Sequence, residues 1–237
     1  MRKLLCVVAS TLILLMGCIS HEESKKELPL LKVSENGRYF QDEKGNPFFW
    51  LGDTGWLLFT KLTREEASSY MDNRVEKGFN VIQVSILHGL GDQNIYGDSA
   101  LIHKNVAMPL ITDGSDPKDS VQYDYWDHAD YIIDLAAEKG LYVAIVPVWG
   151  NNVKYGGVTL EEATIYSRWL AQRYADRNNV IWLNGGDTFG NDSTSIWKSM
   201  GHELKTHGPN HLVTFHPRGR CSSSDWFHNE SWLDFNM

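Results

Sequence analysis

The strongest constraint on the fold is the repeated alternation of strand-like and helix-like segments along the chain. Two junctions between helix and strand are near copies, at residues 76–81 (EKGFNV) and 138–143 (EKGLYV). The apolar runs that continue from them, residues 81–87 and 141–148, have the length of strands and few polar side chains. Such runs are typical of strands covered on both faces. The alternation therefore predicts a parallel sheet with right-handed crossovers.

The helices between these strands carry recognisable first residues. Thr63 with Glu66, and Thr159 with Glu162, have the spacing of capping boxes, and Asp124 is in position to cap a third helix. Because a cap satisfies backbone N–H groups that the helix leaves free, these residues predict where three helices begin.

We predict six parallel strands, preceded by a short β-hairpin around residues 38–40. The predicted strands are residues 48–51, 81–87, 141–148, 180–183, 211–215 and 233–237. A doubly wound sheet and an eight-unit barrel both accommodate this pattern. The helices lack a glycine-rich phosphate-binding start, which disfavours the nucleotide-binding doubly wound fold. We therefore expect an incomplete (β/α)8 TIM barrel of about six strand and helix units. Because a complete barrel typically takes about 250 residues, we expect the chain to belong to a longer protein.

The first 28 residues have the composition of an export signal followed by a tether. Residues 1–17 combine a basic start with an apolar run, and residues 15–18 (LMGC) resemble the lipobox of bacterial lipoproteins. We expect a signal peptide at 1–17, a lipidated Cys18, a polar tether at 18–28 and the N-terminal part of one barrel domain at 29–237. This predicts a membrane-anchored protein of the bacterial cell envelope, periplasmic or on the cell surface. A plain secretory signal or a short membrane anchor is the alternative.

Composition narrows the classes of partner. Asp and Glu outnumber Lys and Arg by 30 to 22, and the net charge of -8 repels phosphate backbones, so we predict no nucleic-acid partner. The nine His residues show no metal-binding spacing, so we predict no metal and no cofactor. With Cys6 in the signal and Cys18 lipidated, Cys221 has no partner for a disulfide in the chain.

Polar and aromatic side chains follow one predicted strand after another. These candidates for contacts with a ligand are Asp53, His88, Trp149, Asp187 and His216. A barrel gathers its functional groups at the carboxyl ends of its strands. Tryptophan can stack on a sugar ring, and His or Asp can hold hydroxyl groups. The alternative for each is a packed or loop-stabilising side chain, and from the residues alone Asp187 is a turn residue.

Several stretches resemble the apiosidase-like glycoside hydrolases, numbered family 140. They are residues 49–54 (FWLGDT), 78–83 (GFNVIQ), 179–187 (NVIWLNGGD) and 222–229 (SSSDWFHN). The resemblance implies a barrel enzyme that cleaves terminal apiose from a pectic, rhamnogalacturonan-type glycan with retention. It assigns the acid/base to Asp187 and places the nucleophile, a Glu on the seventh strand, beyond the end of this chain.

We therefore expect a retaining glycosidase of plant cell-wall glycan. The expected substrate contacts are Asp53, His88, Trp149, His216, Asp225 and Trp226. The alternative is a lipid-anchored glycan-binding protein without catalysis, or an inactive fragment, since the remaining Asp and Glu residues offer no clear nucleophile. Retaining chemistry needs two carboxyl groups about 5 to 5.5 Å apart.

Overall fold

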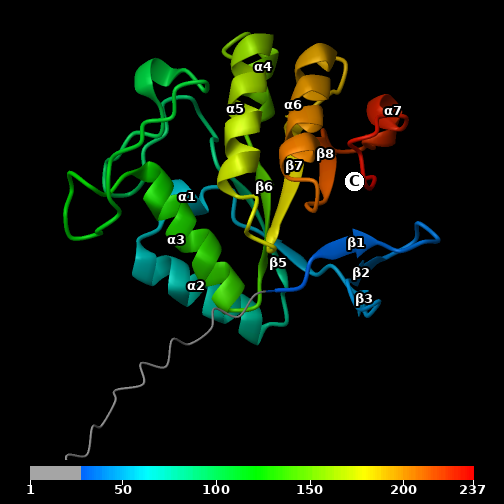
Figure 1. Cartoon of the computed structure of the whole chain (residues 1–237), viewed down its shortest axis with the longest axis horizontal. Helices are drawn as coiled ribbons and strands as arrows, with labels where there is room; N and C mark the ends of the chain where they lie inside the picture. Colours follow the sequence, from blue (N-terminus) through cyan, green and yellow to red (C-terminus); the bar gives the residue numbers. More distant parts are fainter. Residues whose placement is uncertain (1–27) are drawn as a thin grey trace, which may run out of the picture.

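A computed structural model describes residues 28–237 of the chain. Its centre is a parallel sheet in which the order of strands in space equals their order in sequence. The strands are β4 (Gly52–Thr54), β5 (Val81–Ser85), β6 (Tyr142–Val146), β7 (Val180–Thr188) and β8 (Val213–Pro217) (Figure 1). Each pairs in parallel with the next. The prediction of a parallel sheet built from strand and helix units is confirmed.

Helices follow these strands, and the three with predicted caps, α2, α3 and α5, begin where the sequence places them. They are α1 (Leu58–Lys61), α2 (Arg64–Glu76), α3 (Tyr125–Glu138), α4 (Gly150–Lys154), α5 (Leu160–Arg173), α6 (Thr194–His207) and α7 (Ser224–Phe227), with a short 3-10 helix at Ile102–Lys104. Thr63, Asp124 and Thr159 each accept the N–H of the third helical residue, as capping boxes require. Among residues 28–237, no helix combines the length and the apolar character needed to cross a bilayer.

The sheet separates two apolar layers, because successive side chains of a strand point to opposite faces. Ile145 and Trp182 belong to the larger layer, which the helices cover. Ala144 and Ile181, their neighbours in sequence, belong to the smaller layer on the other face. This second layer corresponds to the barrel interior, and its residues near the carboxyl ends of the strands are those available to a ligand.

A small antiparallel sheet precedes the parallel one. Its strands are β1 (Leu31–Val33), β2 (Phe40–Asp42) and β3 (Pro47–Phe48). The prediction of a first parallel strand at residues 48–51 is wrong, since Phe48 pairs with Phe40 and the parallel strand begins at Gly52. The residues between are held by one side chain: Asn80 donates to the carbonyl of Phe49 and accepts the N–H of Leu51.

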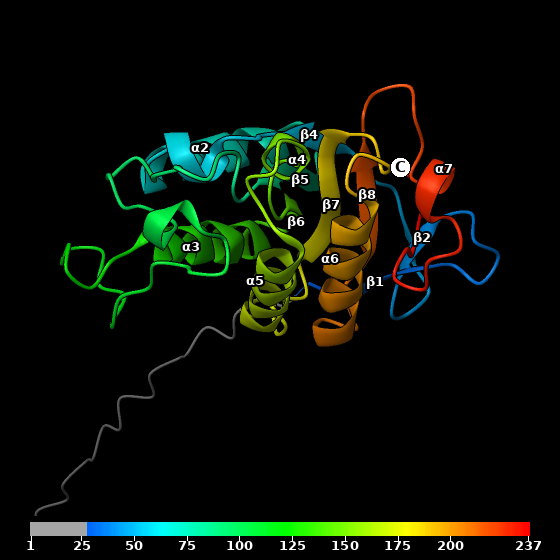
Figure 2. The ribbon, with the colours of Figure 1, turned by 90° about the horizontal axis from the view of Figure 1, so that it is seen from above.

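The predicted sixth strand, residues 233–237, does not form. The segment runs beside β8, where the Asp234 N–H donates to the Val213 carbonyl and the Thr214 hydroxyl donates to the Phe235 carbonyl. A side-chain hydroxyl therefore replaces part of a strand ladder. Phe235 also meets Phe40 edge to face at 4.9 Å, which joins this segment to the small sheet, and both views show β2 and α7 on the β8 side of the parallel sheet (Figures 1 and 2).

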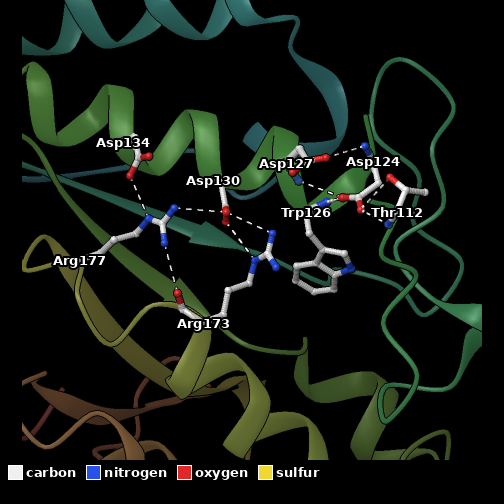
Figure 3. A network of polar contacts seen from close by, with 8 residues as sticks. All are labelled: Thr112, Asp124, Trp126, Asp127, Asp130, Asp134, Arg173 and Arg177. Carbon is white, nitrogen blue, oxygen red and sulfur yellow. Dashed lines mark hydrogen bonds and ion pairs between the residues drawn. The ribbon is translucent and has the colours of Figure 1, made fainter. Parts of the chain in front are cut away.

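Ion pairs fasten α3 to the α5 end that leads into β7 (Figure 3). Arg173 and Arg177 both bind Asp130, at 3.1 and 3.2 Å, and Arg177 also binds Asp134 at 2.9 Å. Because each of these side chains is only about a fifth to a third exposed, the network fixes how two helices pack on the sheet.

Candidate active site

Four aromatic side chains meet at the carboxyl ends of the parallel strands, an end we call the mouth. Trp56 follows β4, His88 follows β5, Trp149 follows β6 and His216 lies in β8. Trp149 is central, with ring centroids 5.1 Å from Trp56, 4.7 Å from His88 and 6.1 Å from His216. Trp56 and His216 also meet edge to face at 5.3 Å. We call these four residues the aromatic cluster.

The cluster brings together three residues predicted to contact substrate, namely His88, Trp149 and His216. Sequence reasoning did not place Trp56 among them. The signal is present, because Trp56 follows its strand at the same end of the sheet as Trp149 follows β6. A first strand predicted at residues 48–51 ends too early to reveal it.

Asp187 lies at the mouth beside the cluster. Its side chain is 61% exposed, and its Oδ1 is 3.7 Å from Nδ1 of His216. Its backbone has a φ of +50° and follows Gly185 and Gly186, with φ of +108° and +111°. In the pairing with β8, Gly185 is opposite His216 and Thr188 is opposite Pro217. Gly186 and Asp187 are therefore extra residues in a bulge.

Both glycines are required by close contacts. A Cβ atom on Gly185 would lie 2.7 Å from the His216 carbonyl oxygen, and one on Gly186 would lie 2.9 Å from the Gly150 nitrogen and 3.1 Å from the Trp149 ring. Bulges of this kind redirect a side chain near functional sites. Here the bulge carries Asp187 out of the strand ladder to the rim of the mouth.

His216 is neutral in this arrangement. The Asp187 N–H donates to Nδ1 of His216 at 3.3 Å, so Nδ1 carries a lone pair and the proton is on Nε2. Burial lowers the pKa of His216, and the charge of Asp187 opposes that shift only in part.

Asp53 does not join the cluster. It lies in β4 and accepts hydrogen bonds from the Tyr70 hydroxyl at 2.8 Å and from Arg74 at 2.9 Å, both on α2. Burial raises the pKa of Asp53, but the bonds from Tyr70, the Thr54 N–H and Arg74 together hold it below its ordinary value. The side chain thus ties β4 to a helix, and the structure gives no support to its predicted contact with substrate.

Asp225 and Trp226 also lie elsewhere, on α7. Asp225 is exposed and accepts the Ser222 N–H at 3.0 Å, which closes the turn before the helix. Trp226 packs against Phe189 and Phe215, with ring centroids 6.0 and 6.2 Å apart. These contacts hold α7 against the sheet and the loop after β7, so neither predicted substrate contact is brought to the aromatic cluster.

Two other acidic residues near the mouth form ion pairs with lysine side chains. Glu230 binds Lys198 at 2.7 Å, and Asp192 binds Lys154 at 3.3 Å and accepts the Thr188 hydroxyl. Asp92 accepts the N–H groups of His88 and Gly89 at 2.8 and 2.9 Å, whereas Asp187 approaches the ring of a cluster residue, His216. The chain within residues 28–237 contains no group of three or more His, Cys, Asp or Glu able to hold a metal ion.

Solved structures resemble the chain over most of its length. A structure described as a glycoside hydrolase is 44% identical, with a TM-score of 0.80, over 88% of this chain and 45% of its own. A structure described as a family 5 glycoside hydrolase from Bacteroides vulgatus is 42% identical, with a TM-score of 0.80, over 88% and 44%. The chain therefore spans less than half the length of these two proteins.

Solved structures with lower sequence identity to the chain support the fold alone. The endo-1,4-β-D-mannanase of Thermotoga petrophila is 18% identical, with a TM-score of 0.55, over 79% of this chain and 63% of its own. The neighbours and the sheet topology confirm the predicted TIM-barrel class, present here as five parallel strands within residues 28–237. No curated protein matches the chain.

The family assignment rests on a model that covers most of the chain. The model described as "Apiosidase-like, catalytic domain" matches residues 34–237. This range contains every parallel strand, the bulge at Asp187 and the aromatic cluster. The chain belongs to the family of apiosidase-like catalytic domains.

Proposed function

We propose that the protein is a retaining glycoside hydrolase that acts on a pectic, rhamnogalacturonan-type glycan, with Asp187 as its acid/base. The observation that carries the proposal is the exposed carboxylate of Asp187 at the mouth, beside the aromatic cluster, whose four rings come from four other strands. The half-buried Trp56 and His88 supply flat and polar surface of the kind that binds sugars, and the buried Trp149 packs against both. The match to an apiosidase-like catalytic domain supports the reaction class.

In this mechanism Asp187 protonates the leaving oxygen and later deprotonates water. A second carboxylate must attack the anomeric carbon from about 5 to 5.5 Å away. The described residues place Asp53 and Glu230 in other contacts. More than half of each of the two similar glycoside hydrolases lies outside the match. We therefore propose that the nucleophile is a Glu outside residues 28–237.

Because the proposed nucleophile lies outside residues 28–237, Asp187→Asn is tested in the protein that carries the complete barrel. Asparagine tolerates the left-handed backbone as aspartate does, so the variant should fold and bind glycan. Its turnover should fall by about 10²-fold to 10⁴-fold, the usual contribution of a general acid. The matched control is Asp176→Asn, an exposed residue at the other end of the sheet, before β7, and its turnover should equal that of the unmodified protein.

Hydrolysis of a pectic oligosaccharide, with the product anomer followed by NMR, gives both rate and stereochemistry. Equal turnover of Asp187→Asn and the unmodified protein would remove Asp187 from the chemistry. An inverted product would refute the retaining mechanism. Binding without turnover in either protein would favour the glycan-binding alternative.

We also propose that Cys18 carries a lipid that anchors the protein in the bacterial cell envelope. Cys18 and the predicted signal at 1–17 lie outside the described residues, and the support is the LMGC sequence at residues 15–18. Cys18→Ala should move the protein from the membrane fraction to the soluble fraction, whereas Cys221→Ala should leave it bound. Membrane retention of the Cys18→Ala protein would contradict the anchor.

A further inference from the structure

The main-chain conformation of Asp187 is unfavourable and needs support from its surroundings. For a residue with a Cβ, a left-handed backbone such as that of Asp187, with a φ of +50°, is unfavourable, although less so for Asp because of its short polar side chain. The bulge also removes Asp187 from the ladder, since neither it nor Gly186 has a partner on β8. The N–H of Asp187 is therefore free of strand pairing, and its direction depends on another acceptor.

That acceptor is the imidazole of His216, directly across the bulge. Nδ1 accepts the Asp187 N–H at 3.3 Å, and the ring itself is fixed from two sides. Trp56, after β4, meets it at 89° and 5.3 Å, and Trp149, after β6, lies at 6.1 Å. Neither neighbour carries charge, so Asp187 on β7 supplies the charge that faces the imidazole. A ring held in this way presents its lone pair in one direction.

We propose that His216 is a positioning residue for Asp187. Its unprotonated Nδ1 holds the Asp187 N–H and so maintains the left-handed backbone that directs the carboxyl group into the mouth. The inference rests on the proposed role of Asp187, and it gives His216 a different role from the substrate contact predicted from the sequence. A misplaced acid should slow the chemical step while leaving substrate binding nearly intact.

A pair of substitutions separates positioning from packing. His216→Leu keeps apolar bulk but has no acceptor, whereas His216→Asn can place its amide oxygen near the position of Nδ1. We expect kcat to fall by about 10-fold to 100-fold in His216→Leu with KM within about threefold of the unmodified value, and to recover most of that loss in His216→Asn. His202→Leu, at an exposed site on α6, is the control and should keep both constants.

Two kinetic outcomes would overturn the proposal. If KM rises and kcat is unchanged in His216→Leu, His216 contacts substrate instead. If His216→Asn and His216→Leu are equally impaired, the acceptor is irrelevant and the loss comes from packing.

A spectroscopic test does not depend on turnover. In the ¹⁵N-labelled unmodified protein at neutral pH, Nδ1 of His216 should resonate as an unprotonated nitrogen. A scalar coupling across the hydrogen bond should join it to the amide nitrogen of Asp187. A protonated Nδ1, or a missing coupling, would overturn the inference even if the protein is an active hydrolase. A protein with this coupling but no turnover on any glycan would contradict the proposed function and leave the hydrogen bond established.

Discussion

The buried His128 should make the fold sensitive to mild acid. His128 lies on α3 with no exposed surface, its Nε2 is 3.1 Å from the Leu62 carbonyl and its Nδ1 is 3.3 Å from the Tyr123 hydroxyl. Because a carbonyl can only accept, Nε2 carries the proton and Nδ1 accepts from Tyr123. The neutral ring thus joins the segment before α2 to the segment before α3, and a second proton would displace Tyr123 as donor.

Burial lowers the pKa of His128 from an ordinary 6.5 to about 4, against the smaller opposing effect of the Leu62 carbonyl. Below pH 6.5 the unfolded chain takes up a proton that the folded chain refuses until about pH 4, so stability falls as the pH falls through this window. Each pKa unit corresponds to about 1.4 kcal/mol. Between pH 7 and pH 5 the unfolding free energy should therefore drop by about 2 kcal/mol because of His128 alone.

Urea unfolding followed by tryptophan fluorescence at pH 7, 6 and 5 measures this drop. His128→Gln can still donate to the Leu62 carbonyl but does not titrate, so its stability should vary by about 2 kcal/mol less across the same range. His202→Gln, an exposed site, is the matched control and should follow the unmodified protein.

One outcome would contradict the prediction for His128. If His128→Gln and the unmodified protein lose the same free energy between pH 7 and pH 5, His128 does not resist protonation and the reasoning from burial fails. His211 is also buried, at 1% exposure, and burial likewise lowers its pKa to about 4. A variant with both His128→Gln and His211→Gln should therefore lose more of the pH dependence in this window than His128→Gln alone.

Three further substitutions test the contacts around the site. Gly186→Ala should destabilise the fold by about 2 kcal/mol or more, seen in urea unfolding, and should shift the fluorescence of Trp149, because the backbone there has a φ of +111° and the added carbon meets that ring at 3.1 Å. Asp53→Asn should cost about 1 kcal/mol by weakening the bond to Tyr70 and leave glycan affinity, measured by calorimetry, unchanged; a large loss of affinity would restore the predicted substrate contact. Asp124→Ala should cost about 2 kcal/mol in the same unfolding assay, since this buried carboxylate caps α3 (Figure 3), while unchanged stability would show that the cap contributes nothing.

Local signals in the sequence are sufficient to locate the three capped helices and the buried strands. Thr63, Asp124 and Thr159 fix helix starts through contacts with residues two or three positions away, which are recognisable in a linear sequence. The strands at 81–85 and 142–146 are buried on both faces, with Gln83 only partly so, so recognising them does not depend on knowing their register. The stretches characteristic of the family are likewise continuous in sequence, so the residues alone are enough to recognise them.

The misplaced elements depend on contacts between distant residues. Residues 48–51 have strand character, yet Phe48 pairs with Phe40 and the parallel strand begins four residues later. This shift places Asp53 inside the strand and determines which face of the sheet its side chain occupies, because side chains of a strand alternate between faces. Only the packing of α2 on the sheet, with Tyr70 and Arg74 reaching Asp53, shows that it faces a helix.

The candidate site shows why Gly185, Gly186 and Asp187 must act as a unit. A regular β7 would bond the residue opposite Pro217 directly after the one opposite His216, with no room for an acid between them. Two extra residues create that room, but only if the preceding positions tolerate positive φ and close contacts, as glycine does. The freed N–H of Asp187 then needs an acceptor, and His216 on the next strand provides it. The short sequence GGD therefore specifies the bulge, whereas its support comes from a residue 29 positions later, which explains why the histidine could be identified as a candidate from sequence but its role could not.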